Sequence, residues 1–225
     1  MFQKIGRFSS RNMLYPVVLS SMLTVGFWAG RVVISESFAY SFLLWDLFLA
    51  WVPYLLSLAV VLLDDRFPGR WWIWAIPFVF WIAFFPNAPY IVTDLIHFDD
   101  RPGAPLWYQL GFFASYAWAG VVLAIVSLNI MHTTIRKYVG GAGGWLFVIS
   151  AILLSGFGIY LGRFLGWNSW DIFVQPHLLL IDLIDRVLHP IRYIRTYGVT
   201  AMFGSFLFVC YLTFTSIQNR GKVED

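Results

Sequence analysis

The chain has 225 residues, of which 60% are hydrophobic and only 12% are charged. The mean hydropathy is +0.72, and a soluble globular domain carries about twice this share of charged residues. We therefore expect an integral membrane protein. The formal net charge of +3 is too small and too scattered to indicate nucleic-acid binding. A single cysteine, Cys210, excludes a disulfide framework and a cysteine metal site within the chain.

Six apolar runs are long enough to cross a bilayer, since a hydrocarbon core of about 30 Å requires about 20 mostly apolar residues per helix. The first run resembles a signal peptide, but it is long and lacks a clear small-x-small cleavage site, so we expect a retained helix. The expected fold is all-α, a polytopic membrane helix bundle that forms one integral-membrane domain over residues 1–225. The expected spans are Met13–Val33, Tyr40–Leu63, Trp71–Phe98, Leu106–Met131, Trp145–Leu165 and Val199–Ile217.

Lysine and arginine are retained on the cytoplasmic side of membrane proteins, so their distribution predicts the orientation of the spans. With both termini in the cytoplasm, the inner segments are the richer in basic residues, although the long segment after the fifth span is an exception. We therefore predict a multi-pass protein of the bacterial cell membrane with both termini inside. The inner set is Lys4, Arg7, Arg11, Arg66, Arg70, Arg136, Lys137, Arg220 and Lys222, and the outer set is Arg31, Arg101, Arg163, Arg186, Arg192 and Arg195.

The third run ends in "FFPNAPYIVTDLIHFDD", where Pro86 and Pro89 interrupt an otherwise helical pattern. Proline removes a backbone donor and disfavours helical geometry before itself, so we expect a broken third helix. Broken membrane helices are found where the backbone groups without helical hydrogen bonds are buried in protein or line a water-filled cavity. Four polar side chains follow at spacings of three, four and three residues, which places them on one stripe in the outer half of the span. They are Asn87, Tyr90, Asp94 and His97.

Further polar residues fall at the same predicted depth. Asp46 lies one or two turns into the second helix, and Arg163 follows Tyr160 at the outer end of the fifth. Asn168 and Asp171 come directly after that helix. An ionisable residue in a membrane helix is costly and usually faces a partner in the bundle. Asp46 and Arg163 could equally be an ion pair that locks helices together, and Asp94 with His97 could be the polar end of a helix at the headgroup level.

Two connections also carry signals. "GGAGG", residues 140–144, predicts a short, flexible inner turn between the fourth and fifth helices. In "QPHLLLIDLIDRVLHP", Pro176 suits a first helical position, and the polar residues that follow recur at helical spacing opposite leucines and isoleucines. We expect an amphipathic helix on the outer leaflet, with a lid or a protein contact as alternatives. Its polar residues are Asp182, Asp185, Arg186 and His189.

The stretches "FFPNAPYIVTDLIHF" and "GIYLGRFLGWNSWD" resemble a bacterial integral-membrane family designated domain of unknown function thirteen sixty-one. The resemblance covers nearly the whole chain. It implies a multi-helix bacterial membrane protein, and it brings no reaction, cofactor or catalytic residue with it.

Three classes of function remain open. An enzyme acting on a lipid-like substrate would use Asp94, His97 and Asp46 for acid and base chemistry. A carrier of a small solute or ion would use the broken third helix, and a structural subunit of a membrane complex would use the polar groups to tie helices together. Asp94 and His97 could instead be ligands of a divalent metal, but they supply only two, so a metal site would also require Asp46, Asp171 or His177. Neither a metal nor a cofactor is assigned. The expected partners are the bilayer and a lipid-like or small-molecule ligand. The residues expected to bind that ligand are Asn87, Tyr90, Tyr160, Arg163, Asn168 and Asp171.

Overall fold

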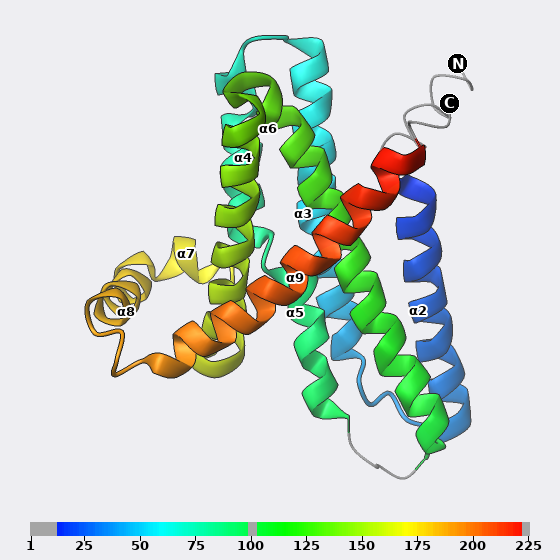
Figure 1. The fold of residues 1–225 in the computed structure, drawn as a ribbon. Helices are drawn as coiled ribbons and strands as arrows, with labels where there is room; N and C mark the ends of the chain where they lie inside the picture. The colour runs from blue at the N-terminus through cyan, green and yellow to red at the C-terminus, as the bar shows by residue number, and fades with distance from the viewer. Residues whose placement is uncertain (1–12, 99–102, 222–225) are drawn as a thin grey trace. The chain divides into compact units, whose positions relative to one another are not determined.

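The computed structural model describes residues 13–98 and 103–221, and every regular element in these ranges is a helix (Figure 1). The basic residues Lys4, Arg7, Arg11, Arg101 and Lys222, used above for the orientation, lie outside the described residues. The chain divides into two compact units, Met1–Thr134 (unit 1) and Ile135–Asp225 (unit 2). The single-domain organisation over residues 1–225 stays a prediction.

Unit 1 begins with α2 (Leu14–Ser35) and α3 (Phe42–Arg66). The next span consists of α4 (Trp71–Phe84), α5 (Asn87–Tyr90) and the 3-10 helix η1 (Ile91–His97). The first part of α6 (Leu106–Leu165) completes the unit. These runs are helical because a bilayer offers no partner for backbone N–H and C=O groups, and a helix satisfies them within the segment.

Within the described residues, five helical segments are long and apolar enough to cross a membrane, as expected of a multi-pass membrane protein. The fourth is α6, whose 60 residues would span about 90 Å as one straight helix, about three times the hydrocarbon core. Gly140 interrupts it with φ 75° and ψ −176°, a conformation that favours glycine. Residues 106–139 form a first arm and residues 141–165 a second. The segments number six when the arms are counted separately.

The prediction of a turn over residues 140–144 is therefore wrong in extent. Only Gly140 leaves the helical conformation, and the helix resumes at Gly141. A single residue with positive φ is sufficient to bend the chain, so the remaining glycines stay helical despite their low propensity.

The third span changes its helix type along its length. Phe85 (φ −55°, ψ −38°) and Pro86 (φ −59°, ψ −24°) keep right-handed helical angles between α4 and α5. The helix then changes to the tighter 3-10 type in η1. Prolines 86 and 89 cannot donate backbone hydrogen bonds, which favours this change. Trp71–His97 is apolar enough to count as one span, and a broken helix at this point stays a prediction.

A buried polar chain ties three helices of unit 1 together. The fully buried Trp81 of α4 donates from Nε1 to the Ser127 hydroxyl of α6 over 2.8 Å. That hydroxyl donates to the Pro53 carbonyl of α3 over 3.0 Å. These two hydrogen bonds satisfy both the Trp81 and the Ser127 donor at this helix crossing. A buried donor without a partner would lower the stability of the fold by about 1–3 kcal/mol.

Helix α2 is bound to the rest of unit 1 by three polar contacts. Trp51 Nε1 donates to the Ser21 hydroxyl over 3.0 Å. The Thr24 hydroxyl donates to the Ser115 carbonyl over 3.2 Å, and the Tyr108 hydroxyl donates to the Phe27 carbonyl over 2.7 Å. Polar side chains of this kind hold membrane helices together, because lipid offers them no other partner.

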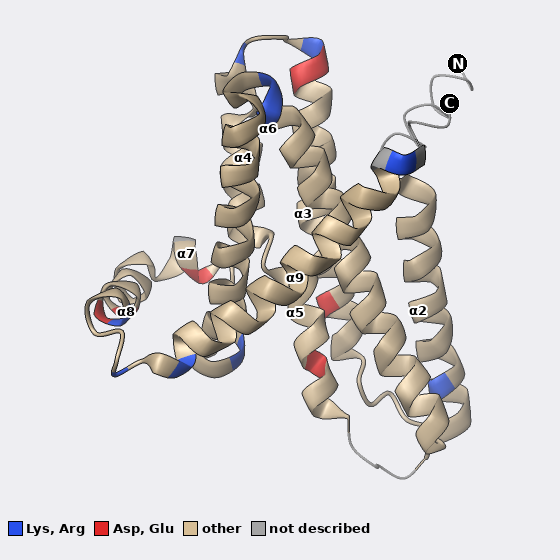
Figure 2. Ribbon diagram, in the orientation of Figure 1, with Lys and Arg blue, Asp and Glu red and all other residues tan. Residues whose placement is uncertain are grey.

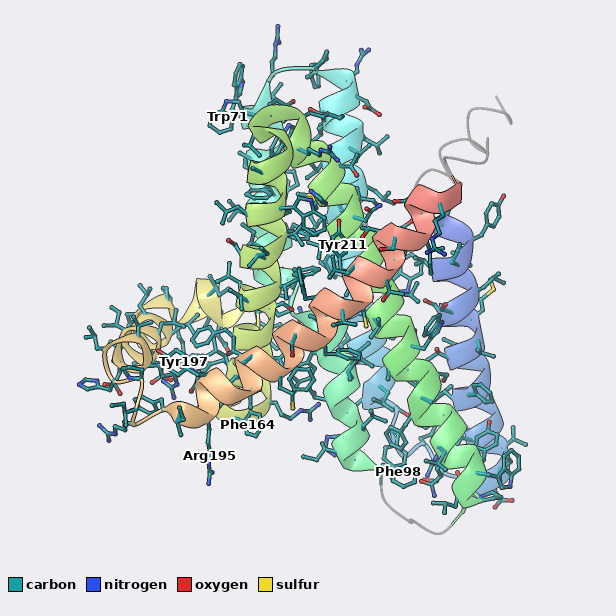
Figure 3. All side chains as sticks on the ribbon, viewed as in Figure 1. Trp71, Phe98, Phe164, Arg195, Tyr197 and Tyr211 are labelled. Atoms are coloured by element: carbon teal, nitrogen blue, oxygen red, sulfur yellow. The ribbon has the colours of Figure 1, made fainter. Side chains whose placement is uncertain are left out.

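Unit 2 contains the second arm of α6, a short α7 (Asp171–Val174), α8 (Pro176–Leu188) and α9 (Ile194–Gly221). The rings of Trp145 and Tyr211, the latter labelled in Figure 3, lie 6.0 Å apart. A Cβ atom on Gly156 would lie 2.7 Å from the Thr200 carbonyl oxygen. These two contacts show that the second arm of α6 and α9 run antiparallel. The helix predicted between the last two spans is confirmed as α8, and its place on the outer leaflet stays a prediction.

Charged side chains are rare along the spans. Figure 2 shows the long helices tan over most of their length, with basic positions mainly at helix ends and connections. The acidic positions within the tan ribbons of unit 1 are therefore the exception, and the site is built from them.

Candidate functional site

The centre of the site in unit 1 is Asp94, a carboxylate in η1 that is only 2% exposed. Residues three apart are eclipsed in a 3-10 helix, so His97 lies directly along the same line. His97 is exposed, since it is the last residue of η1. The Asp94 and His97 side chains thus share a stripe, as predicted, with one inside and the other at the surface.

Helix α3 lies beside this stripe. The rings of Phe42 and His97 meet edge to face at 5.3 Å, and the Tyr40 hydroxyl donates to the His97 carbonyl over 3.4 Å. The third span runs antiparallel to α3 and packs against it. Measured from the Phe42–His97 contact, Asp94 lies three residues earlier in η1 and Asp46 lies four residues later in α3. Each offset corresponds to a rise of about 6 Å along the helix axis. The two carboxylates therefore lie at the same depth, one level inside the Phe42–His97 contact.

A third helix, α6, brings Tyr116 to this level. The rings of Phe98 and Phe113 are 6.0 Å apart, and Gly120 lies against Ala88, so α6 also runs antiparallel to the third span. Tyr116 falls between these two contacts and is 1% exposed. Its hydroxyl has no hydrogen-bond partner among the described residues. The Asp46 carboxylate lies close enough to act on it electrostatically.

The other predicted site residues divide between the two units. Asn87 and Tyr90 are half-buried on α5 in unit 1. Tyr160 is buried and Arg163 half-buried on the second arm of α6 in unit 2. A pairing of Arg163 with Asp46 stays a prediction.

Asn168 and Asp171, also in unit 2, have a local structural role. The Asn168 backbone N–H donates to Asp171 Oδ2 over 2.7 Å, a contact that closes the turn before α7. Asn168 is exposed and Asp171 is half-buried. Among the described residues, no three His, Cys, Asp or Glu side chains lie close enough together to hold a metal ion.

Unit 2 contains a polar cluster between α8 and its flanking segments. Trp167 Nε1 donates to Asp182 Oδ2 over 2.9 Å, and the nearly buried Arg186 pairs with Asp182 at 3.5 Å. Asp185 accepts a short hydrogen bond from the Tyr193 hydroxyl and pairs with His189 Nδ1 at 2.9 Å. The polar residues of α8 thus bind one another and the flanking segments, with Arg186 buried and Asp182, Asp185 and His189 partly exposed.

A family model for proteins of unknown function, DUF1361, matches residues 45–214, which is well over half of the chain. The chain belongs to the DUF1361 family. The match begins just before Asp46 and ends within α9, so it contains Tyr116 and every predicted site residue, and it leaves α2, Tyr40 and Phe42 outside. Comparison with curated proteins and with solved structures found no match. The resemblance drawn from the two sequence stretches is confirmed, and the bacterial origin stays a prediction.

Sequence reasoning missed two residues of this DUF1361 protein. Tyr116 stands in the uniformly apolar stretch "FFASYAWAG", where only a glycine one turn later hints at close packing. The sequence places Arg31 only among the outer basic residues, yet it is 2% exposed and its guanidinium carbon lies 4.5 Å from the centre of the Tyr40 ring. Arg31 and Tyr40 together join α2 to the end of η1.

The cluster on α8 predicts a pH effect. The hydrogen bond from Tyr193, assisted by His189, holds the pKa of the Asp185 carboxyl below its ordinary value of 3.8. A lowered pKa means that this interaction stabilises the fold above pH 3.8 and that the stabilisation is lost as the pH falls through the folded-state pKa. Tyr193→Phe is expected to raise the Asp185 pKa toward 3.8, as measured by NMR titration of aspartate-labelled protein.

Tyr197→Phe is the matched control for this titration. The Tyr197 hydroxyl, from the start of α9 (Figure 3), donates to the Arg186 carbonyl over 2.9 Å and makes no hydrogen bond to Asp185. An equal change of the Asp185 pKa in both variants would show that the Tyr193 hydrogen bond is not its cause.

Proposed function

We propose that Asp94, Asp46 and Tyr116 of unit 1 form a polar site near the extracytoplasmic face of the membrane, and that this site catalyses a reaction on a lipid-like substrate. The observation that carries the proposal is the burial of the Asp94 carboxylate, which is nearly complete. The Asp46 carboxylate on α3 and the buried Tyr116 phenol on α6 lie at the same depth along the bundle. The proposal places both termini in the cytoplasm of a bacterial cell, on the basis of the basic residues in the connections.

Proton transfer is the chemistry that these groups are suited to. Carboxyl groups and a phenol can each donate or accept a proton, and positioned groups of this kind contribute rate factors of about 10²–10⁴. A carboxylate inside a membrane helix is costly to keep, which favours a functional role or a specific partner over chance. The exposed His97 lies one 3-10 turn from Asp94, and an imidazole, which can donate or accept a proton, is suited to pass protons to the aqueous side.

A lipid-like substrate agrees with the surroundings of the site. The spans that carry it present apolar side chains outward along most of their length, including Trp45 and Phe48 on either side of Asp46. A substrate with an apolar chain could approach from the bilayer and place a polar head at the level of Asp94. Tyr90 and Asn87, half-buried about one and two turns before Asp94, would hold that head by hydrogen bonds.

One observation favours a carrier as the second candidate. The third span changes from α-helix to 3-10 helix around two prolines, and transporters bind solutes and ions at helices that are interrupted in this way. In a carrier, Asp94 and Asp46 would bind a proton or a cation in transit. A purely structural protein would instead use them to tie helices together.

Asp94→Asn separates these functions. The purified protein is reconstituted into liposomes of a bacterial lipid extract, and the lipids are compared by mass spectrometry before and after incubation. The wild type is expected to convert a lipid species, and Asp94→Asn is expected to lose at least about a hundredfold in rate while it melts at the same temperature. Asp65→Asn, at the exposed opposite end of α3, is the matched control and should keep its activity.

Two outcomes would contradict the enzyme proposal. If no lipid changes but proton flux into the liposomes depends on Asp94, the protein is a carrier. If neither activity is found and Asp94→Asn lowers the melting temperature, the carboxylate is structural. Asp46→Asn should have the same effect as Asp94→Asn in whichever outcome is observed, because the two carboxylates lie at the same depth and are assigned to one site.

A further inference from the structure

The amphipathic helix α8 turns its apolar side outward. Its leucine, isoleucine and valine side chains at six positions follow one helical stripe and are all exposed, five of them by 55–67% and the one just beyond the helix by 89%. This is the reverse of a surface helix in a water-soluble protein, which buries its apolar stripe. The stripe consists of Leu180, Ile181, Ile184, Val187, Leu188 and Ile191.

The polar residues of α8 bind one another and the flanking segments, although Asp182, Asp185 and His189 stay partly exposed. Asp182 accepts from Trp167 and pairs with Arg186, whose NH1 also donates to the Asp182 carbonyl over 2.7 Å. The Arg186 guanidinium carbon lies 4.9 Å from the centre of the Tyr193 ring, and Tyr193 bonds Asp185. The charged groups of α8 therefore pair within the helix and with Trp167 and Tyr193 of the flanking segments, on the side opposite the apolar stripe.

The position of α8 in unit 2 restricts what can cover this face. The second arm of α6 and α9 run antiparallel, so the segment between them, residues 166–193, leaves and rejoins the spans at the same end (Figure 1). The 13 residues of α8 span about 20 Å, too few to cross a hydrocarbon core of about 30 Å. The helix thus belongs at one membrane face.

Two further observations favour lipid as the surroundings of the stripe. The exposed apolar surface continues from Ile191 to Ile194, which is 68% exposed and begins the membrane span α9. Trp167 and Trp170 stand at the end of the α6 span, where tryptophans mark the boundary of the bilayer. The stripe of α8 is therefore continuous with a surface that faces acyl chains.

We propose that α8 lies flat in one leaflet of the bilayer, with the stripe facing the acyl chains and the side that carries Asp182 and Arg186 turned away from them. Apolar burial drives this contact. Residues 166–195 contain three aspartates (171, 182 and 185) and three arginines (186, 192 and 195), so their net charge is zero with histidine neutral. Attraction to anionic lipid therefore adds little. The proposal is independent of the function of the Asp94 site.

Site-directed spin labels test the proposal in the full chain. Cys210 is replaced by alanine, and single cysteines are placed at Ile181, Ile184 and Ile191, whose exposed side chains tolerate a label without disturbing the core. A label at Asn168, which is exposed on a polar turn, is the matched control. The labelled proteins are reconstituted into phosphatidylcholine liposomes with and without phosphatidylglycerol.

The accessibility of each label to oxygen, which concentrates in lipid, is compared with its accessibility to a water-soluble nickel chelate. The oxygen-to-nickel ratio is expected to be several-fold higher at the three stripe positions than at Asn168, and unchanged by phosphatidylglycerol. High nickel accessibility at the stripe would overturn the proposal in favour of an aqueous face. Low accessibility of the stripe labels to both reagents would overturn the proposal in favour of a protein contact. In that case, spin–spin broadening that grows with protein density would identify a second copy of this protein as the contact.

Discussion

Gly120→Ala is expected to destabilise the protein by about 1–3 kcal/mol, the usual cost of inserting an extra carbon into a well-packed core. The added Cβ would lie 2.5 Å from the Ala88 carbonyl oxygen and 3.2 Å from Ile91 Cβ. A backbone carbonyl cannot rotate away as a side chain can, so α6 and α5 must separate. The loss is measured as a lower melting temperature in detergent by circular dichroism.

Gly111→Ala is the matched control, because it lies on the same arm of α6 and a Cβ there would meet nothing within 4 Å. Alanine is the better helix former by about 0.5–1 kcal/mol, so this variant is expected to melt at the same or a slightly higher temperature. Equal melting of the two variants would contradict the close approach of α6 to α5. That approach also sets the level of Tyr116, so Gly120→Ala should impair the proposed activity as well.

Gly156→Ala is expected to have an effect of similar size in unit 2. Its Cβ would lie 2.7 Å from the Thr200 carbonyl oxygen and 3.3 Å from the Gly204 backbone nitrogen. Both atoms belong to the backbone of α9, so the second arm of α6 would have to move away from α9 at a cost of about 1–3 kcal/mol. Limited proteolysis of the α7–α8 segment and thermal melting are the measurements, because separation of these helices should loosen the segment that joins them.

Gly198→Ala provides the control, since a Cβ on this helical residue of α9 would meet nothing within 4 Å. If Gly198→Ala destabilised the protein as much as Gly156→Ala, helix propensity or lipid contact would be the cause and not the helix crossing. Gly156→Ala should leave the proposed chemistry of Asp94 intact in protein that stays folded.

The positions of the spans could be predicted from the sequence because the length of an apolar run is set by the thickness of the bilayer. The expected first span, Met13–Val33, corresponds to Leu14–Ser35, and the expected second, Tyr40–Leu63, to Phe42–Arg66. Helix α8 was recognisable for a related reason, since its polar residues recur with the period of a helix.

The composition of the site was less predictable, because depth and neighbours depend on how helices pack. The stripe of Asp94 and His97 follows from spacing, but the burial of one and the exposure of the other depend on where η1 ends. Tyr116 lies at the level of Asp46 only because Gly120 permits a close crossing, and one residue in an apolar run does not reveal its partner helix. Gly140 shows the same limit, since five residues of glycine-rich sequence predicted a turn where one residue bends the helix.

The polar contacts of α2 show that the start of the family match and the start of the packed unit 1 fall at different places in the chain. The family model starts at residue 45, after α2, so the shared sequence pattern does not include this helix. Yet the Trp51 indole, the Ser115 carbonyl and the Tyr108 hydroxyl, all inside the matched region, find their partners on α2. A protein cut down to the matched residues would leave these groups facing hydrocarbon. The region that the family model matches is thus shorter than the packed unit 1, because α2 supplies hydrogen-bond partners to residues inside that region.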